Sequence, residues 1–148
     1  MKDSVTLQDF AFVVDIPTRW SDLDLLGHVN NARFFSFDES ARLEYFGELM
    51  RSDPEFWKAR GLILARIGCD FIAQLHHPAL LKVGFRIARI GRTSMSTLCG
   101  MFANDRLIAV SSGVVVWYDY NNQKPQPVPE YVREMIRARE RIAPDESS

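Results

Sequence analysis

The sequence has few cysteines and lacks any long apolar run, and each shortage excludes a class of protein. Cys69 and Cys99 are the two cysteines among 148 residues, too few for a disulfide scaffold and not spaced as a C-x-x-C pair. We expect both to be reduced core thiols in a cytoplasmic protein. No segment approaches the roughly 18 apolar residues that span a bilayer. Acidic residues flank the short apolar run near the start, which does not fit a signal peptide.

The chain also lacks an excess of charge. Lys and Arg total 18 and Asp and Glu total 19, which gives a formal net charge of −1. Because phosphate backbones select basic proteins, nucleic acid is not an expected partner. Apolar residues make up 47% of the chain, enough for a core and too many for a disordered segment. We therefore expect one soluble domain, residues 1–148, without a nucleic-acid or membrane partner.

A first strand followed by one long helix is predicted for the N-terminal third. Residues 10–20 are rich in Val, Ile, Phe and Thr, which is typical of a strand, and Pro17 favours an edge position. Asn30 is a suitable N-cap for a helical pattern over residues 31–46, and Gly47 is a suitable stop. At about 100° per residue, one half of this helix collects the apolar residues Phe34, Phe35, Phe37, Ala41, Tyr45, Phe46 and Leu49.

Strands are expected after Gly61, because the apolar period changes there from about 3.6 to 2. They cover residues 63–75, 82–88, 95–103 and 107–118, and the short turns between them make neighbouring strands antiparallel. The last strand is apolar on both faces. We therefore expect it to be central in the sheet and to meet a partner subunit at its outer positions.

A short C-terminal helix completes the expected elements. Pro129 and Glu130 open it, with Val132, Met135 and Ile136 facing inward. The fold class is therefore α+β, with one long helix against one face of a curved antiparallel sheet.

The densest polar cluster is RWSDLDLLGHVNN, residues 19–31, between the first strand and the long helix. Asp24 supplies a carboxylate that can act as a base or a nucleophile. Gly27 permits a sharp turn and the close approach of a ligand, and His28 follows Asp24 by four positions. The backbone N–H groups of the helix start can face an oxyanion or a polarised carbonyl. Together these features predict an acyl-transfer site.

Structural interpretations stand beside this catalytic one. Asp24 is equally suited to an Asx turn. Asp22 could pair with it as a general acid and base, although a loop cap or a solvent-facing position is favoured. His76 and His77 would need further ligands with suitable spacing to bind a metal, so a plain loop between strands is favoured for them.

Asp38 lies in the middle of the apolar half of the helix, where an unpaired carboxylate is costly. Arg42 follows four residues later on the same face, which favours a buried ion pair. The alternative is that Asp38 or Glu39 supports a polar wall of the pocket.

The run RWSDLDLLGHVNNARFF, followed by FDESARLEYF, closely resembles the hotdog-fold acyl-CoA thioesterases of the 4-hydroxybenzoyl-CoA thioesterase type. The pattern of that family is roughly Asp-x-Asp-x-x-Gly-His-Val-Asn-Asn-x-x-Tyr, then Glu-Glu-Ala-Arg, and Phe34 replaces its tyrosine. The element order also fits, so the resemblance covers most of the chain. It implies a single hotdog thioesterase domain that hydrolyses an acyl-CoA thioester to a free acid and coenzyme A. It implies no metal and no cofactor beyond the coenzyme that the substrate carries.

The resemblance also assigns roles to residues. Asp24 matches the catalytic aspartate, which attacks the thioester carbonyl or activates a water, and the backbone N–H at Asn31 matches the group that polarises the thioester oxygen. His28, Gly27 and Asn30 match residues that shape the loop and hold substrate or water. Coenzyme A would meet basic and small polar residues near a later turn, with Arg89, Arg92, Thr93 and Ser94 as candidates. Self-association as a homodimer or homotetramer is expected.

Two rival functions remain open. Hotdog hydratases place their Asp and His five positions apart, whereas Asp24 and His28 are four apart, so an enoyl-CoA hydratase ranks below a thioesterase. A module that binds acyl-CoA without turning it over is the third possibility.

Overall fold

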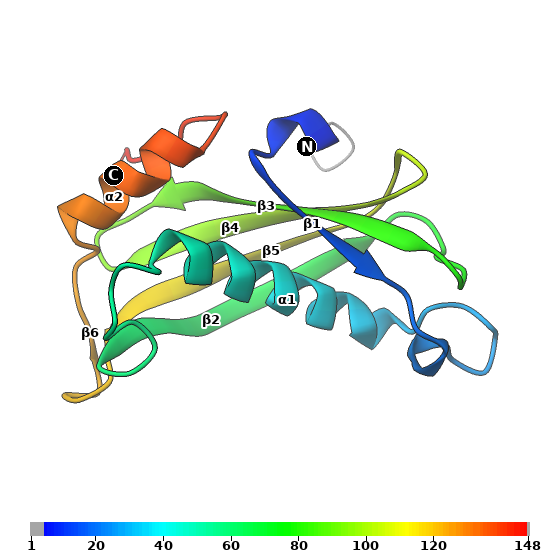
Figure 1. Cartoon of the computed structure of the whole chain (residues 1–148), viewed down its shortest axis with the longest axis horizontal. Helices are drawn as coiled ribbons and strands as arrows, with labels where there is room; N and C mark the ends of the chain where they lie inside the picture. Colours follow the sequence, from blue (N-terminus) through cyan, green and yellow to red (C-terminus); the bar gives the residue numbers. More distant parts are fainter. Residues whose placement is uncertain (1–4, 148) are drawn as a thin grey trace.

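A curved antiparallel sheet wraps around one long helix in the computed structural model, which describes residues 5–147 (Figure 1). The predicted domain, residues 1–148, extends beyond this range by residues 1–4 and 148, which lie outside the described residues. The α-helices and β-strands are β1 (Phe12–Pro17), α1 (Asn31–Leu49), β2 (Arg60–Phe71), β3 (Leu80–Ile90), β4 (Ser94–Ala103), β5 (Arg106–Asp119), β6 (Lys124–Pro125) and α2 (Glu130–Arg139), with short 3₁₀ helices at Leu7–Asp9 and Trp20–Asp22. This order confirms the predicted α+β class.

The strand order is β1-β3-β4-β5-β2, with every neighbouring pair antiparallel and β6 attached to β5. β1 is an edge strand, as Pro17 indicates, and β5 is central as predicted. Because β4 and β2 bond both edges of β5, a partner cannot extend the sheet there. Among the described strands, β2 carries three exposed large apolar side chains, Ile63, Leu64 and Phe71, whereas β1 and β3 carry one each, Val13 and Leu80. β5 therefore offers no free edge, and the predicted subunit contact at its outer positions stays a prediction.

Helix α1 packs its apolar half onto the concave side of the sheet (Figure 1). The Asn30 side chain accepts a hydrogen bond from Ala32 N at 2.9 Å, which confirms the predicted N-cap. The helix continues two residues past Gly47 to Leu49. Phe35 is 37% exposed, contrary to prediction. Its ring lies 6.4 Å from that of Phe71 at the free β2 edge, where no further strand covers it.

The C-terminal helix α2 begins at Glu130, after Pro129, as predicted. Val132 and Ile136 are buried, and Met135 is half-buried against the core. No helix among residues 5–147 is long and apolar enough to span a membrane.

Both cysteines are free thiols, but only Cys99 is fully buried, since Cys69 is half-exposed. Burial, together with the nearby carboxylates of Asp70 and Asp38, raises the pKa of Cys69 to about 11. Burial likewise raises the pKa of Cys99 well above its usual value. Because the thiolate is the reactive form, we expect alkylation by iodoacetamide at pH 8 to be about 100-fold slower in the folded than in the unfolded protein. A rapid phase that consumes one thiol of the folded protein would contradict this.

Candidate active site

The loop between β1 and α1 is built around the Asp24 carboxylate. Its Oδ1 accepts hydrogen bonds from Leu26 N at 2.9 Å and His28 N at 3.3 Å. The Asp24 N–H donates to His28 O at 2.9 Å, and Gly27 adopts a φ of 80°, which suits glycine. The turn-forming interpretation of Asp24 is thus confirmed, but it uses one oxygen only. Asp24 Oδ2 has no hydrogen-bond donor among the described residues, so it remains available for chemistry.

Asp22 is a structural residue of the same loop. It is fully buried, and its carboxylate accepts hydrogen bonds from Arg19 N at 2.8 Å and Arg19 Nη2 at 2.9 Å. Burial favours the neutral form, yet the hydrogen bonds and charge of Arg19 lower the pKa of Asp22 overall. The Asp22 carbonyl accepts from Asn30 N at 2.8 Å. The loop-cap interpretation is therefore confirmed, and the solvent-facing alternative is wrong.

The tip of α1 presents a backbone donor. Asn30 Oδ1 bonds Ala32 N, and Asn30 O accepts from Arg33 N at 2.9 Å. In the part of the chain that the structure describes, the N–H of Asn31 has no acceptor. It sits at the positive end of the helix dipole, where a developing negative charge is stabilised. Since the Asn30 side chain is committed to the cap, the structure gives it a helix-capping role.

A cleft of about 330 Å³ brings Asp24, His28 and Asn31 together. The other lining residues are Leu26, Val29, Phe34, Phe71, Ile72, Ala73, Gln74 and Leu75. The structure thus assembles three of the predicted site residues around a space of the size that small ligands occupy. Gly27 shapes the turn beside it.

One wall of the cleft was missed by the sequence prediction, which extends a strand to Leu75. β2 ends at Phe71, because Ile72 N and Ala73 N both donate to the carbonyl of Ile108 and the chain bends. Leu75 O then accepts from Val29 N at 2.9 Å, which ties the segment to the Asp24 loop. Residues 72–75, which we call the strap, therefore form one wall of the cleft.

His28, which lines the cleft, contacts His76, which does not. Their rings are edge to face with centroids 5.0 Å apart, and their backbones form an antiparallel bridge. His76 lies in a loop, as favoured from the sequence. Within residues 5–147, no group of three or more His, Cys, Asp or Glu side chains is placed to hold a metal ion.

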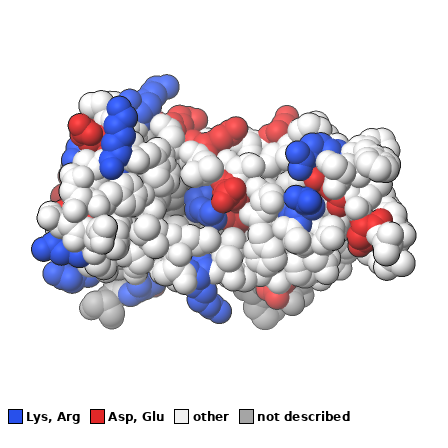
Figure 2. All heavy atoms as spheres, turned by 90° about the horizontal axis from the view of Figure 1, so that it is seen from below, with Lys and Arg blue, Asp and Glu red and all other residues white. Residues whose placement is uncertain are grey.

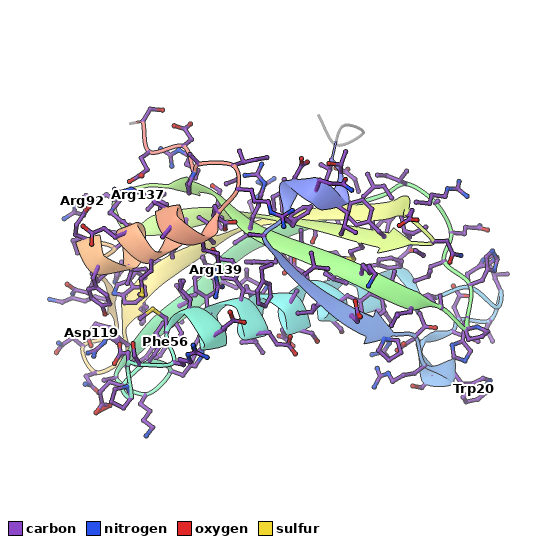
Figure 3. All side chains as sticks on the ribbon, turned by 45° about the horizontal axis from the view of Figure 1, so that its top comes forward. Trp20, Phe56, Arg92, Asp119, Arg137 and Arg139 are labelled. Atoms are coloured by element: carbon purple, nitrogen blue, oxygen red, sulfur yellow. The ribbon has the colours of Figure 1, made fainter. Side chains whose placement is uncertain are left out.

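The predicted coenzyme A contacts lie elsewhere in the chain. Arg89 ends near the C-terminus, with Nη2 3.4 Å from Ser147 O, and Ser94 opens β4. The carbonyls of Arg92 and Thr93 accept from Val128 N and Trp117 N. In Figure 3 Arg92 lies beside α2 at one end of the molecule, and Trp20 of the Asp24 loop lies at the other. Within one chain, the structure does not bring these four residues to the cleft, and their contact with coenzyme A stays a prediction.

Asp38 forms the buried ion pair predicted with Arg42, at 2.5 Å between Oδ1 and Nη1. A second partner was missed by the sequence analysis, since Ser111 Oγ on β5 donates to Asp38 Oδ2 at 2.5 Å. Neither Asp38 nor Glu39 lines the cleft, and the Glu39 side chain is exposed. Within one chain neither side chain is part of the cleft wall, and indirect support of that wall by Asp38 stays a prediction.

Comparison with known proteins agrees with this architecture. The family model described as "Thioesterase-like superfamily" matches residues 18–136. A thioesterase of Thermus thermophilus, solved in complex with coenzyme A and Zn, is 35% identical, covers 89% of this chain and 96% of its own, and superposes with a TM-score of 0.79. A predicted thioesterase from Bacillus stearothermophilus is 28% identical over 86% of this chain and 95% of its own, also with a TM-score of 0.79.

A more partial match is the uncharacterized protein YsmA of Bacillus subtilis (strain 168), which is 26% identical over 87 residues. The match covers 59% of this chain and 58% of that protein. The family match and the shared architecture confirm the resemblance stated from the loop motif. The chain is therefore a hotdog-fold member of the thioesterase-like superfamily.

Proposed function

We propose that this protein hydrolyses an acyl-CoA thioester to a free carboxylic acid and coenzyme A. The observation that carries the proposal is the cleft in which the Asp24 carboxylate and the tip of α1 meet. Among the described residues, one Asp24 oxygen and the N–H at the start of α1 have no hydrogen-bond partner, and these are the two kinds of group that acyl transfer uses. The coenzyme A complex of the Thermus relative supports coenzyme A as the carrier of the acyl group.

The chemistry follows from the two groups. The thioester oxygen accepts from the Asn31 N–H, which stabilises the negative charge that develops as the carbonyl carbon is attacked. Asp24 Oδ2 either attacks that carbon, to give an acyl-aspartate that water then hydrolyses, or removes a proton from an attacking water. In both routes the carbon–sulfur bond breaks and coenzyme A leaves as the thiolate. His28, half-buried in the same cleft, holds substrate or water, and no cofactor is proposed.

Thiol release from short, medium, long and aromatic acyl-CoAs tests this function. We expect one class to be hydrolysed, with one thiol and one acid formed for each thioester consumed. Loss of the conjugated absorbance of an enoyl-CoA without thiol release would indicate a hydratase. Binding without turnover of every substrate would indicate a binding module, and either result would overturn the proposal.

A second copy of the chain is proposed to dock on β2. In the described sheet β2 is an edge strand, so its outer N–H and C=O groups have no strand partner. Ile63 and Leu64 on this strand are 42% and 41% exposed. Figure 2 views the molecule from below, with charged side chains scattered among wide uncharged areas. Two β2 strands related by a two-fold axis can pair antiparallel and bury these side chains mutually.

We expect the wild type to be at least dimeric in sedimentation velocity, and the Ile63→Lys variant to be monomeric because a buried lysine pair opposes association. Leu80→Lys is the matched control. Leu80 is 52% exposed and lies on β3, so this variant should remain associated. A monomeric wild type would reject the β2 contact.

The two free thiols fit the proposed cytoplasmic location.

A further inference from the structure

Asp38 is a buried carboxylate that the proposed chemistry does not use. It is 1% exposed, in the interior of α1, and each of its oxygens has one strong partner. Arg42 lies on the same helix, so that bond stays within α1. Ser111 lies on β5, so the second bond joins the helix to the sheet.

Burying a charged carboxylate at a core position has a free-energy cost. Burial raises the pKa of Asp38, and the Ser111 hydrogen bond and the Arg42 charge offset only part of that cost. A well-packed apolar residue at such a site often gives equal or greater stability than a buried ion pair. What an apolar side chain cannot supply is a directional bond, so the group is better explained by positioning than by stability.

The bond joins the helix to the centre of the sheet. Ser111 is flanked in register by Cys69 on β2 and Cys99 on β4, so its position is fixed from both sides. The other direct contacts between α1 and the sheet are mainly apolar, such as Phe46 against Phe85 with ring centroids 6.3 Å apart. A second polar link is indirect and lies further from the cleft, where Glu140 accepts from both Tyr45 Oη and Ile87 N. Apolar contacts are non-directional and tolerate a small slide of the helix along its axis. The Asp38–Ser111 bond does not.

Asn31, at the tip of α1 that faces the cleft, lies on the same side of the helix as Asp38. Asn31 and Asp38 are seven residues apart, which is about two turns and roughly 10 Å along the axis, on the same face of α1. Phe34 lies between them, lines the cleft and packs its ring 5.5 Å from that of Phe71. The backbone bonds at the tip, Asn30 N to Asp22 O and Val29 N to Leu75 O, tie it only to the Asp24 loop and the strap.

We propose that Asp38 is a positioning residue: through its hydrogen bond with Ser111 it fixes α1 along its axis and so places the Asn31 N–H against the thioester oxygen. The proposal rests on the proposed function. The bond acts on the chemical step rather than on substrate affinity, because the N–H gains most from the charge that develops during the reaction.

The Ser111→Ala variant tests this directly, because it removes the bond to the sheet and keeps the Asp38–Arg42 pair. We expect kcat to fall about 10-fold or more, since small misplacements of a catalytic group are costly, while KM stays within about twofold. The amide resonance of Asn31 in an NMR spectrum should shift. Ser111→Cys keeps a weak S–H donor of similar volume and should recover part of the lost kcat.

The matched control is Tyr45→Phe, which removes a buried bond at the other end of the same helix, from Tyr45 Oη to Glu140 Oε2 at 2.6 Å. It should lower the melting temperature while leaving kcat and the Asn31 resonance unchanged. Equal effects of Ser111→Ala and Tyr45→Phe on kcat and on the resonance would reduce Asp38 to a structural residue. If the wild type releases no thiol, the proposed function fails. The Asn31 resonance then tests positioning by itself, and an unmoved signal overturns it.

Discussion

The Asp24→Asn variant is expected to release thiol about 10³-fold more slowly than the wild type at saturating substrate, because general-base or nucleophilic catalysis is lost. The melting temperature should stay the same. Asparagine retains the Oδ1 atom that accepts from Leu26 N and His28 N, so the loop keeps its shape. Its amide nitrogen replaces Oδ2, which is the oxygen without a donor among the described residues. Initial rates and thermal melts of both proteins give the comparison.

Asp15→Asn is the matched control for this substitution. Asp15 is a half-exposed carboxylate on β1 that pairs with Lys82 at 2.9 Å, and it lies outside the cleft. Its variant should keep the wild-type rate within about twofold, as expected for an exposed ion pair. If Asp24→Asn retains more than a tenth of the wild-type rate, then the Asp24 carboxylate is not the group that acts on the thioester.

The Asn31→Pro variant is expected to lower kcat by about 10² to 10³, the effect of removing one oxyanion donor. Asn31 is the first residue of α1, a position where proline is tolerated because its N–H has no partner within the helix. The preceding residue, Asn30, has φ −60° and ψ 136°, which a following proline favours. The substitution therefore deletes one N–H with little change in folding, which a thermal melt verifies.

Asn31→Ala separates the backbone from the side chain. It removes the asparagine side chain from the cleft and keeps the N–H. We expect its kcat to stay within about threefold of the wild type, in contrast to the loss of about 3–4 kcal/mol of transition-state stabilisation in the proline variant. Equal losses in both variants would assign the effect to the side chain and remove the helix tip from the mechanism.

The sequence was sufficient to locate the Asp24 loop, because local chemistry dictates its geometry. An asparagine with an extended backbone just before a helical pattern caps the helix, as Asn30 does. Gly27 supplies the positive φ that closes the turn. Asp24 forms an Asx turn within its own neighbourhood. These features involve residues a few positions apart, so a single sequence carries enough information to predict them.

Contacts between distant segments were beyond the same reasoning. The periodicity of α1 places Asp38 on the inner face but does not indicate which strand residue it meets, since that depends on the position of the helix over β5. The strap was missed for a similar reason, because its alternating pattern continues that of β2 while its backbone bonds go to Ile108 and Val29. The helical spacing places Phe35 on the apolar half of α1, yet its side chain is exposed because the sheet ends there at the β2 edge.

The distance between the Asp24 loop and the turn with Arg92 shows what a list of motif residues omits. They were predicted to contact the thioester and the coenzyme A part of one acyl-CoA, respectively, but within one chain they lie at opposite ends of the molecule (Figure 3). A second subunit can unite such ends, which links the candidate coenzyme contacts to the proposed association through β2. If the proposed association holds, the site includes residues of both subunits.

The most direct measurement is a crystal structure of the protein with a ketone analogue of an acyl-CoA, in which a methylene group replaces the thioester sulfur. The account predicts the ketone oxygen about 3 Å from Asn31 N and the ketone carbon facing Asp24 Oδ2. A carbonyl group bound away from the tip of α1, or with its carbon facing another side chain, would contradict it.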